Sequence, residues 1–438
     1  MDPSTLIAHR GGLHTAAEVA MMDPSTLIAH RGGLHTAAEV AAIESVVAAG
    51  LLPMSALPST DAPAPGALAP PPGGLPYRRR VYGPFEGDAS GPTDPIRLAM
   101  HRGQTKLCCG ELDAITRALA RVPGLRYVLY AGAAPGEHIA FLAELFPALE
   151  FYLVDPAEFR VPRRYREFPG VARRIHITRG LFTDAIARAW APRAAQTIFF
   201  SDIRSGTHTS DSFEAEVAEN MAMQRRWWAL GGFAAASFKL RFPYVPAGAG
   251  GQPGAKVPYL DGENLLQPFG PNTSTEGRLL VWAGAGARDY DPAAYESYYF
   301  WLNNVVREWA AFDHGIELSR APGLCYCFDC ARMVQIFRAA AGAAGDAEVV
   351  RLLHRMVDAT EQRFLDPPHG VQPATPPADK RLALAAEYSR LYLKKRARKI
   401  VDRAAIVPAA PALCAAIVPP GAARIPKIQL KMRSFGSS

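Results

Sequence analysis

The chain has 438 residues, of which 49% are hydrophobic and 20% charged, a composition typical of a globular protein with one large domain or two smaller ones. Six cysteines are too few for a disulfide scaffold of this length, and we expect a reducing compartment. The longest apolar tract, residues 404–418, is too short and too interrupted by proline to span a bilayer, so we expect no membrane insertion. The net charge of +7 permits a polyanionic partner without requiring one.

The two ends of the chain are expected to lie outside the main folded domain. Residues 1–20 recur unchanged as residues 22–41, and a single duplication is not a solenoid, which needs more copies. Residues 51–74 are rich in Pro, Ala and Gly, which is typical of a flexible linker. We therefore expect three regions: a disordered extension over residues 1–75, a folded domain over residues 76–366, and a mobile linker, basic helix and Pro/Ala-rich tail over residues 367–438.

Between these ends, helix-like and strand-like segments alternate. Helical periodicity over residues 101–122 precedes a short apolar strand at 127–130, which runs into a glycine-rich turn. Further strands are expected at 151–154, 175–178, 197–200, 233–238 and 279–282, and a further helix at 211–230. Buried strands that alternate with helices predict an α/β fold with a doubly wound, mostly parallel sheet and helices on both faces.

The glycine-rich turn is a candidate cofactor site. Gly132 and Gly136 lie between the first strand and the next helix, where the backbone can approach a ligand closely. Asp155 closes the following strand, near the offset of about 20 residues at which an acid meets a ribose hydroxyl in Rossmann-type sites. A dinucleotide would require the spacing G-x-G-x-x-G, and Pro135 removes an amide donor that a pyrophosphate would use. S-adenosylmethionine has no pyrophosphate, so we prefer this methyl donor, and a tight turn without a ligand is the remaining alternative.

Charged residues stand at the ends of the expected strands beside this turn. Asp202 follows one strand, Lys239 ends the next, and Glu276 precedes the last. With Lys106 they form a set of two lysines and two acids that suits methyl transfer to a ribose hydroxyl. A lysine whose pKa is lowered by burial can accept the hydroxyl proton, and we assign this role to Lys239. Lys106 would orient the hydroxyl and the acids would position the lysines, although each residue alone could be an ordinary surface charge.

Five blocks of sequence carry a resemblance to a known family. They are Gly103–Leu112, Tyr130–Ile139, Ser201–Ser205, Phe238–Tyr244 and Leu266–Leu280. Over about residues 77–364 the chain resembles the poxvirus cap-specific mRNA (nucleoside-2′-O-)methyltransferases, which are also small regulatory subunits of the viral poly(A) polymerase. The resemblance implies a Rossmann-like, S-adenosylmethionine-dependent methyltransferase that acts on the first transcribed nucleotide of capped mRNA. It also implies a heterodimer with the poly(A) polymerase catalytic subunit, and a location in the host cytoplasm and the virion.

The resemblance also assigns roles to individual residues. Catalytic roles fall on Lys106, Asp202, Lys239 and Glu276. Contacts to the methyl donor fall on Gln104, Tyr130, Gly132, Gly136, Asp155 and Arg204. The cap guanine would stack between Tyr244 and a second ring, for which Tyr82 is preferred over Phe85, and Glu296 would bind its edge.

The sequence departs from the family pattern around the expected cap pocket. Pro246 stands where the family has a guanine-binding carboxylate, and Thr273 stands where it has a tyrosine. Residues 247–255 form a glycine-rich insertion. These departures concern cap binding more than methyl transfer.

Two alternatives to a methyltransferase come from other functional classes. A catalytically silent, RNA-binding processivity factor would not need the Lys/Asp/Lys/Glu set, which is complete here. A nicotinamide-dependent oxidoreductase is disfavoured by the glycine spacing.

Two further patterns allow a structural and a functional interpretation. Cys325, Cys327 and Cys330 are interpreted as structural, and no metal site is expected, because no second Cys or His pair follows at finger-like spacing. Several arginine clusters, together with Trp227 and Trp228, could form an RNA track or could be solvated arginines and core tryptophans. The clusters are 78–80, 163–164, 173–174 and 225–226. The run 394–399 could aid RNA retention or solubility.

Overall fold

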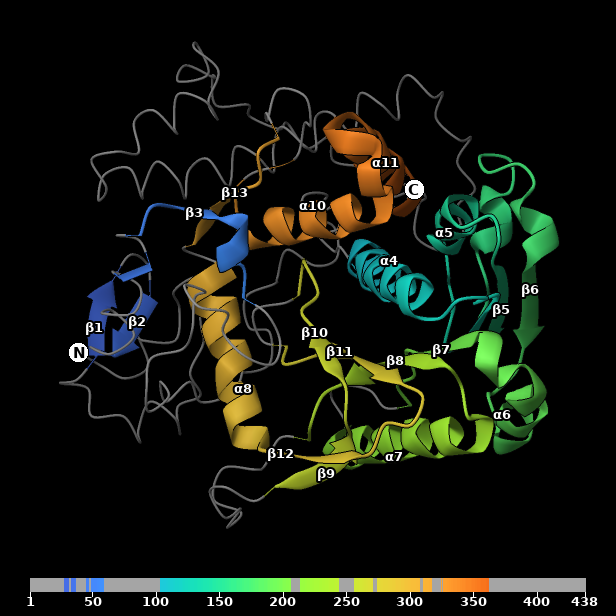
Figure 1. The fold of residues 1–438 in the computed structure, drawn as a ribbon. Coiled ribbons are helices and arrows are strands. Elements are labelled where there is room, and N and C mark those ends of the chain that lie inside the picture. Colours follow the sequence, from blue (N-terminus) through green and yellow to red (C-terminus); the bar gives the residue numbers. More distant parts are fainter. Residues whose placement is uncertain are drawn as a thin grey trace, which may run out of the picture.

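A seven-stranded, mostly parallel sheet forms the centre of the computed structural model (Figure 1). The structure describes residues 27–30, 33–36, 45–46, 49–58, 103–205, 213–243, 256–270, 274–307, 310–316, 324 and 326–361. The strand order is β10 (Glu263–Leu265), β11 (Gly277–Trp282), β8 (Ala235–Leu240), β7 (Thr197–Ser201), β4 (Tyr127–Ala131), β5 (Glu150–Asp155) and β6 (Ile175–Arg179). β11 runs antiparallel to both of its neighbours, β10 and β8, and the other neighbouring strands pair in parallel.

The order of the strands reverses beside β4. The chain passes from β4 outward through β5 and β6, and then returns to β7 on the other side of β4. In open α/β sheets, ligands bind at such a reversal, outside the carboxyl ends of the strands. The end of β4 runs into the glycine-rich turn, so this turn lies at the expected position for a ligand.

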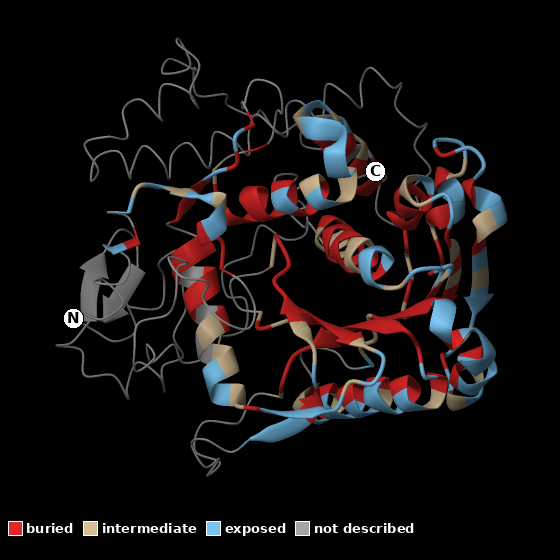
Figure 2. Ribbon diagram, viewed as in Figure 1, coloured by how far each residue is buried: buried red, intermediate tan, exposed pale blue. Residues whose placement is uncertain are grey.

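Helices cover both faces of the sheet (Figure 1). On one face lie α4 (Gly103–Arg121), α5 (Ile139–Leu145), α10 (Phe328–Ala341) and α11 (Gly345–Glu361), and on the other lie α6 (Asp184–Trp190) and α7 (Phe213–Gly231). Alternation along the strands explains the two layers: Val128 and Tyr130 pack on the first face, and Leu129 and Ala131 on the second. Figure 2 shows that the central strands are mostly buried, whereas the outward side of α7 is exposed.

The six strands predicted between residues 127 and 282 are confirmed, with shifts of one or two residues at their ends. Shorter elements were not predicted, because segments of three or four residues give no clear periodicity. These are β9 (Val257–Leu260), β10, β12 (Ala287–Tyr290), β13 (Ala311–Asp313), β3 (Leu51–Pro53) and the hairpin β1 (Leu27–His30) with β2 (Gly33–Thr36). Short 3-10 helices are η3 (Met54–Ala56), η5 (Val161–Arg164), η6 (Val171–Arg174), η7 (Ala191–Gln196) and η9 (Gly342–Ala344).

A third hydrophobic cluster, apart from those on the two faces of the sheet, includes α8 (Pro292–Trp301) and the π-helical turn Leu302–Val306 that continues it. Here the prediction of a disordered extension is wrong for residues 51–58. Strand β3 pairs in parallel with β13, and Leu57 is buried in a cluster with Trp301 and Phe312. A few apolar side chains within the Pro/Ala-rich stretch are enough to dock it. Residues 59–75 and the predicted tail, residues 367–438, lie outside the described residues.

Within the described ranges, every helix is too short or too polar to cross a bilayer.

Candidate functional site

The glycine-rich turn after β4 requires glycine at two positions. Gly132 has φ +79°, and its amide donates to the carbonyl oxygen of Val154 at 2.9 Å. A Cβ on Gly132 would lie only 3.0 Å from the backbone of Asp202 and of Ile203. Gly136 has φ +66°, and a Cβ there would lie 2.9 Å from a carbonyl oxygen. The turn therefore packs directly against the backbone that follows β7, with no room for side chains.

The carboxylate of Asp155 stabilises this turn. It ends β5 and accepts hydrogen bonds from the backbone amides of Ala134 at 3.1 Å and Ala157 at 2.7 Å. The side chain remains partly exposed at the sheet edge. Asp155 therefore joins the glycine-rich turn to the end of the next strand.

The structure brings the Lys/Asp/Lys/Glu set together at the same edge. Lys106 Nζ lies 2.7 Å from Glu276 Oε1. Lys239 Nζ lies 3.0 Å from Asp202 Oδ1 and 3.7 Å from Glu276 Oε2. All four side chains are only 10–16% exposed, so these ion pairs are poorly screened by water.

Strand register explains why these residues meet. Lys239 pairs with Arg278 across β8 and β11, so Glu276, just before β11, lies beside the end of β8. Asp202 follows β7, and its amide donates to Ala131 at the end of β4 at 3.0 Å. Lys106 lies in the first turn of α4, which packs over the same face.

Arg278 is a further member of the site that the sequence analysis did not predict. It is almost fully buried, donates to the carbonyl oxygen of Ser201 at 3.1 Å and forms an ion pair with Asp202. Burial opposes its charge, but the Asp202 carboxylate outweighs this effect and raises the pKa of Arg278. The sequence did carry a signal for Arg278, because it is a charged residue inside an otherwise apolar strand.

Burial and the neighbouring charges lower the pKa values of Lys239, Glu276 and Asp202. Burial lowers the pKa of Lys239, although the carboxylates of Asp202 and Glu276 oppose this shift. Burial alone would raise the pKa of Glu276, but Lys106 and Lys239 hold it well below its usual range. The pKa of Asp202 is likewise lowered, because Arg278 and Lys239 outweigh its burial. The site therefore keeps its acids ionised and makes Lys239 easier to deprotonate than an ordinary lysine.

Gln104 and Tyr130, which were predicted to contact the methyl donor, belong to a buried hydrogen-bond network. Tyr130 donates to Glu111 Oε1 at 2.6 Å, so its hydroxyl is directed into the interior. His138 places one ring nitrogen 2.7 Å from Glu111 Oε2 and the other 2.8 Å from Gln104 Oε1. The network ties α4 to the glycine turn, and sequence spacing gave no signal for Glu111 or His138.

Arg204 lies beside the cluster with one nitrogen lacking a hydrogen-bond partner. Its Nη1 donates to the carbonyl oxygen of Ile203 at 3.3 Å, and its Nη2 lies 3.8 Å from Glu276 Oε2. Nη2 is buried and makes no hydrogen bond in the described part of the chain. Burial lowers the pKa of Arg204. A guanidinium nitrogen that makes no hydrogen bond is a suitable donor for an anionic group of a ligand.

The structure describes only one of the predicted cap-binding residues. Glu296 lies partly buried on α8, and its neighbour Tyr295 donates to the carbonyl oxygen of Leu240, next to Lys239, at 3.2 Å. Tyr82 and Tyr244 lie outside the described residues. The alternative ring Phe85, the glycine-rich insertion and the two family departures also lie outside them.

Two of the three described arginine pairs have one member with a structural role. Arg164 donates to Ala359 O at 2.8 Å, and Arg174 donates to the carbonyl oxygens of Phe146 and Leu149 at 3.1 and 2.9 Å. These bonds engage the second member of the pairs 163–164 and 173–174, whereas Arg225 and Arg226 are both exposed. The first members, 163 and 173, are exposed. The arginines at 78–80 and the run 394–399 lie outside the described residues.

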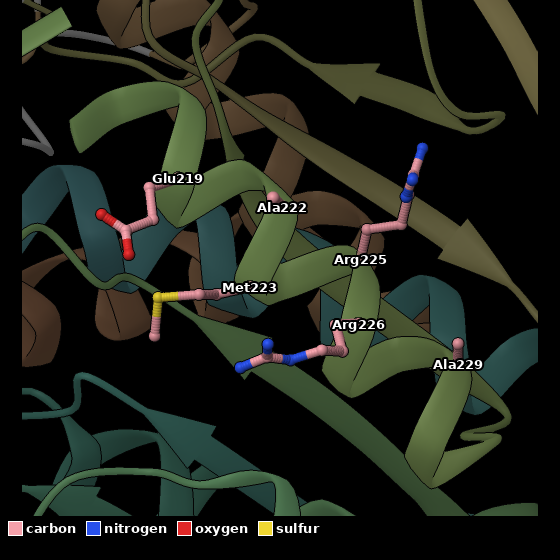
Figure 3. A pocket seen from close by; sticks show the side chains of 6 residues that line it. All are labelled: Glu219, Ala222, Met223, Arg225, Arg226 and Ala229. Atoms are coloured by element: carbon pink, nitrogen blue, oxygen red, sulfur yellow. The ribbon is translucent and has the colours of Figure 1, made fainter. Parts of the chain in front are cut away.

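The outer side of α7 carries a shallow depression of about 640 Å³ (Figure 3). It is lined by Glu219, Ala222, Met223, Arg225, Arg226 and Ala229. None of these belongs to the Lys/Asp/Lys/Glu set, so the depression is not the candidate site. Trp227 and Trp228 are buried core residues, as the structural interpretation predicted.

The cysteine cluster is partly described. Cys327 and Cys330 are buried around the start of α10, and Cys325 lies outside the described residues. Within the described ranges, His, Cys, Asp and Glu side chains form no group that could hold a metal ion.

Comparisons with known proteins point to one family. Residues 86–320 match the family described as "Poly A polymerase regulatory subunit". Two curated relatives, from Myxoma virus strains Lausanne and Uriarra, are each 26% identical over 220 residues, covering 47% of this chain and 62% of theirs. Both are named cap-specific mRNA (nucleoside-2′-O-)-methyltransferase. The chain thus spans about three fifths of the length of the curated relatives it matches. Lys106, Asp202, Lys239 and Glu276 all lie within the residues that match the family.

Proposed function

Because the chain belongs to the family of poly(A) polymerase regulatory subunits, we propose that it methylates the ribose 2′-hydroxyl of the first transcribed nucleotide of capped mRNA. The fold in this proposal is a Rossmann-like methyltransferase with a doubly wound sheet. The observation that carries the proposal is the position of Lys239. Its amine lies 3.0 Å from Asp202 and 3.7 Å from Glu276, at the sheet edge next to the glycine turn.

The residues around the turn suit S-adenosylmethionine. When bound, this cofactor supplies an electrophilic methyl group on a sulfonium. Gly132 leaves room for close approach, since a Cβ there would meet backbone at 3.0 Å. The Nη2 of Arg204, which makes no hydrogen bond in the described part of the chain, suits the carboxylate of the methionine moiety. Asp155 would accept a hydrogen bond from the ribose, and Gln104 and the backbone of Tyr130 would complete the contacts.

Lys239 acts as general base in this mechanism. Its neutral amine would accept the proton of the ribose 2′-hydroxyl, and the bound methyl donor would supply the methyl group while its sulfur keeps the electron pair of the broken carbon–sulfur bond. The lowered pKa of Lys239, caused mainly by burial, makes the neutral amine more accessible near physiological pH. Lys106 orients the hydroxyl, and Asp202 and Glu276 hold the two lysines. Alignment of the hydroxyl with the methyl group supplies most of the remaining rate enhancement.

The proposal extends to the rest of the transcript and to a protein partner. Tyr244, with Tyr82, would stack on the positively charged cap guanine, and Glu296 would bind the guanine edge. The chain would also form a heterodimer with a poly(A) polymerase catalytic subunit and act as its processivity subunit. It would function in the host cytoplasm and in the virion.

The second candidate is a catalytically silent processivity factor. The family description alone favours it as much as it favours an enzyme. A processivity role, however, needs no buried lysine between two carboxylates. The enzyme is therefore preferred.

The test is methyl transfer from labelled S-adenosylmethionine to short capped RNA. The parent should incorporate label at the 2′-oxygen of the first nucleotide. Lys239→Ala should lower kcat by at least about 10²-fold with donor binding retained. Lys239→Arg should not restore activity, because a guanidinium cannot be deprotonated. Lys256→Ala, at an exposed lysine, is the matched control and should match the parent. No transfer by a parent that binds both donor and RNA would favour the silent processivity factor.

A further inference from the structure

One side of α8 and of the π-helical turn after it contacts the segments that carry Lys239 and Glu276. Tyr295, Tyr299, Asn303 and Arg307 recur at intervals of four residues along this stretch. Helical residues four apart project to the same side, so these side chains form a continuous row, here called the α8 row. A π-helical turn within a helix is frequently found at functional sites.

The first half of the α8 row contacts the two strands of the site. Tyr295 donates to the carbonyl oxygen of Leu240, the residue after Lys239, at 3.2 Å. Tyr299 donates to Asn264 Oδ1 at 3.1 Å. Its hydroxyl is packed so closely on Gly277 that a Cβ there would lie 2.0 Å away. The start of β11 is therefore fixed directly against α8.

The second half of the α8 row holds the backbone just before Glu276. Asn303 Nδ2 donates to the carbonyl oxygen of Ser274 at 2.7 Å. The hydroxyl of Ser274 in turn accepts from the amide of Glu276 at 3.1 Å. Arg307 Nε donates to Asn303 Oδ1 at 2.9 Å, which fixes the orientation of the Asn303 amide.

Arg307 extends the contacts to the turn before this backbone and to α10. Its Nη2 donates to the carbonyl oxygen of Gln267 at 2.6 Å, and its Nη1 pairs with Asp329. Asp329 also accepts from the amide of Phe269 at 2.9 Å. Phe269 has φ +60°, a left-handed conformation that a bulky side chain rarely adopts. Such a conformation persists only where the surroundings enforce it, and here Arg307 and Asp329 do so.

We propose that the α8 row positions Glu276 against Lys106 and Lys239, with Asn303 and Arg307 as positioning residues for the methyl transfer. This inference rests on the proposed function for its catalytic consequence. The Glu276 carboxylate lies 2.7 Å from Lys106 and 3.7 Å from Lys239, so a small displacement of its backbone would change both distances. A displacement of about 1 Å in an active site can lower the rate about 10²-fold.

The test uses two substitutions that loosen the row without removing a catalytic group. Asn303→Asp is isosteric and keeps the acceptor for Arg307, but loses the donor to Ser274. Arg307→Lys removes the forked contacts to Gln267 and Asp329. The matched control is Arg164→Lys, because buried Arg164 also pairs with a carboxylate, Glu167 at 2.9 Å, and donates to a carbonyl oxygen, Ala359 O at 2.8 Å.

The primary measurement is amide hydrogen exchange over residues 274–282, together with NMR titration of the Lys239 amine. Both positioning variants should raise exchange there at least about tenfold and leave residues 127–131 unchanged. The pKa of Lys239 should fall in both, because Glu276, which raises it, moves away. In an active parent, kcat should fall about 10²-fold while the dissociation constant of S-adenosylhomocysteine stays unchanged.

The outcomes separate the inference from the proposed function. Unchanged exchange and unchanged Lys239 titration overturn the inference, and so does a loss of kcat that Arg164→Lys shares equally. Faster exchange with full kcat also overturns it, since the row would then hold the backbone without positioning the carboxylate for transfer. A parent that transfers no methyl group defeats the proposed function. Exchange and titration then still decide whether the row positions Glu276.

Discussion

Lys106 and Glu276 are separated by 170 positions in the chain, and their side chains form a hydrogen-bonded ion pair of 2.7 Å. The second oxygen of the Glu276 carboxylate lies 3.7 Å from Lys239 Nζ. One carboxylate thus stands between two amines that would otherwise repel each other. Glu276 has two effects on Lys239: its carboxylate holds the amine in place, and it favours the protonated form of the amine.

The pH profile of the reaction should report this second effect. The pKa of Lys239 is lowered from 10.5, mainly by burial, so kcat should rise with pH and level off with a midpoint below 10.5. Glu276→Gln removes a charge that raises the pKa of Lys239, so the midpoint should move to lower pH while the plateau falls. The exposed Glu219→Gln is the control. A midpoint that stays in place or moves upward in Glu276→Gln would show that Lys239 is not the titrating base.

The docked N-terminal segment should contribute to stability. Leu57 is 6% exposed and packs in the cluster around Trp301, whereas Leu51, in the same segment, is 38% exposed. Leu57→Ala should lower the free energy of unfolding by about 2–4 kcal/mol, through lost burial and the cavity left behind. Leu51→Ala should cost less than about 1 kcal/mol. Urea unfolding measures both, and equal small losses would mean that the segment does not dock in solution.

That segment shows where composition fails as a predictor. A Pro/Ala-rich stretch has a low average tendency to fold, and on this basis the sequence predicts a linker over residues 51–74. Docking depends on the particular side chains available, and Leu57 with its neighbours finds an apolar surface on α8 and β13. That surface is assembled from residues far along the chain, so no local pattern reveals it.

The candidate site, too, was only partly predictable from the sequence. The meeting of Asp202 and Lys239 could be predicted, because the carboxyl ends of neighbouring parallel strands lie at one edge of a sheet. Glu276 precedes β11, which runs antiparallel to β8, and the sequence could not show that it faces Lys239. No strand-end argument placed Lys106, whose position depends on how α4 packs over the sheet. Arg278 and the contacts of the α8 row were also not predicted, since they depend on side-chain geometry between distant elements.

The buried pair of Asp202 and Arg278 should dominate the stability of the site. Asp202→Asn leaves the Arg278 charge buried with its partner lost, which should cost about 3–5 kcal/mol. The double variant Asp202→Asn with Arg278→Met should recover much of this loss. Additive losses in urea unfolding would show that the two side chains are not coupled.

Acid unfolding gives a second measure of this pair. The folded-state pKa of Asp202 is lowered, so its contribution to stability is full above the unfolded value of about 3.9 and is lost as pH falls through the folded value. The parent should therefore lose more stability than Asp202→Asn when the pH falls from neutral to below 3.9. Equal acid sensitivity of the two proteins would contradict an ionised, charge-paired Asp202.

Gly132 and Gly124 offer a matched test of whether the glycine-rich turn binds the methyl donor. Both have left-handed backbones, with φ of +79° and +83°, but a Cβ on Gly132 would lie 3.0 Å from the backbone at Asp202, whereas one on Gly124 meets nothing within 4 Å. Gly124→Ala should therefore show only the cost of backbone conformation, about 1–2 kcal/mol. Gly132→Ala should lower the free energy of unfolding by about 1–3 kcal/mol more, because the turn must move away from the backbone that follows β7.

Donor binding distinguishes this turn from an ordinary tight turn. Displacing the turn should weaken S-adenosylmethionine binding at least about tenfold in Gly132→Ala, equivalent to about 1.4 kcal/mol, while Gly124→Ala binds as the parent does. Calorimetry with S-adenosylmethionine and urea unfolding on the same three proteins measure affinity and stability separately. If Gly132→Ala loses stability but keeps its affinity, the turn is structural and the donor binds elsewhere.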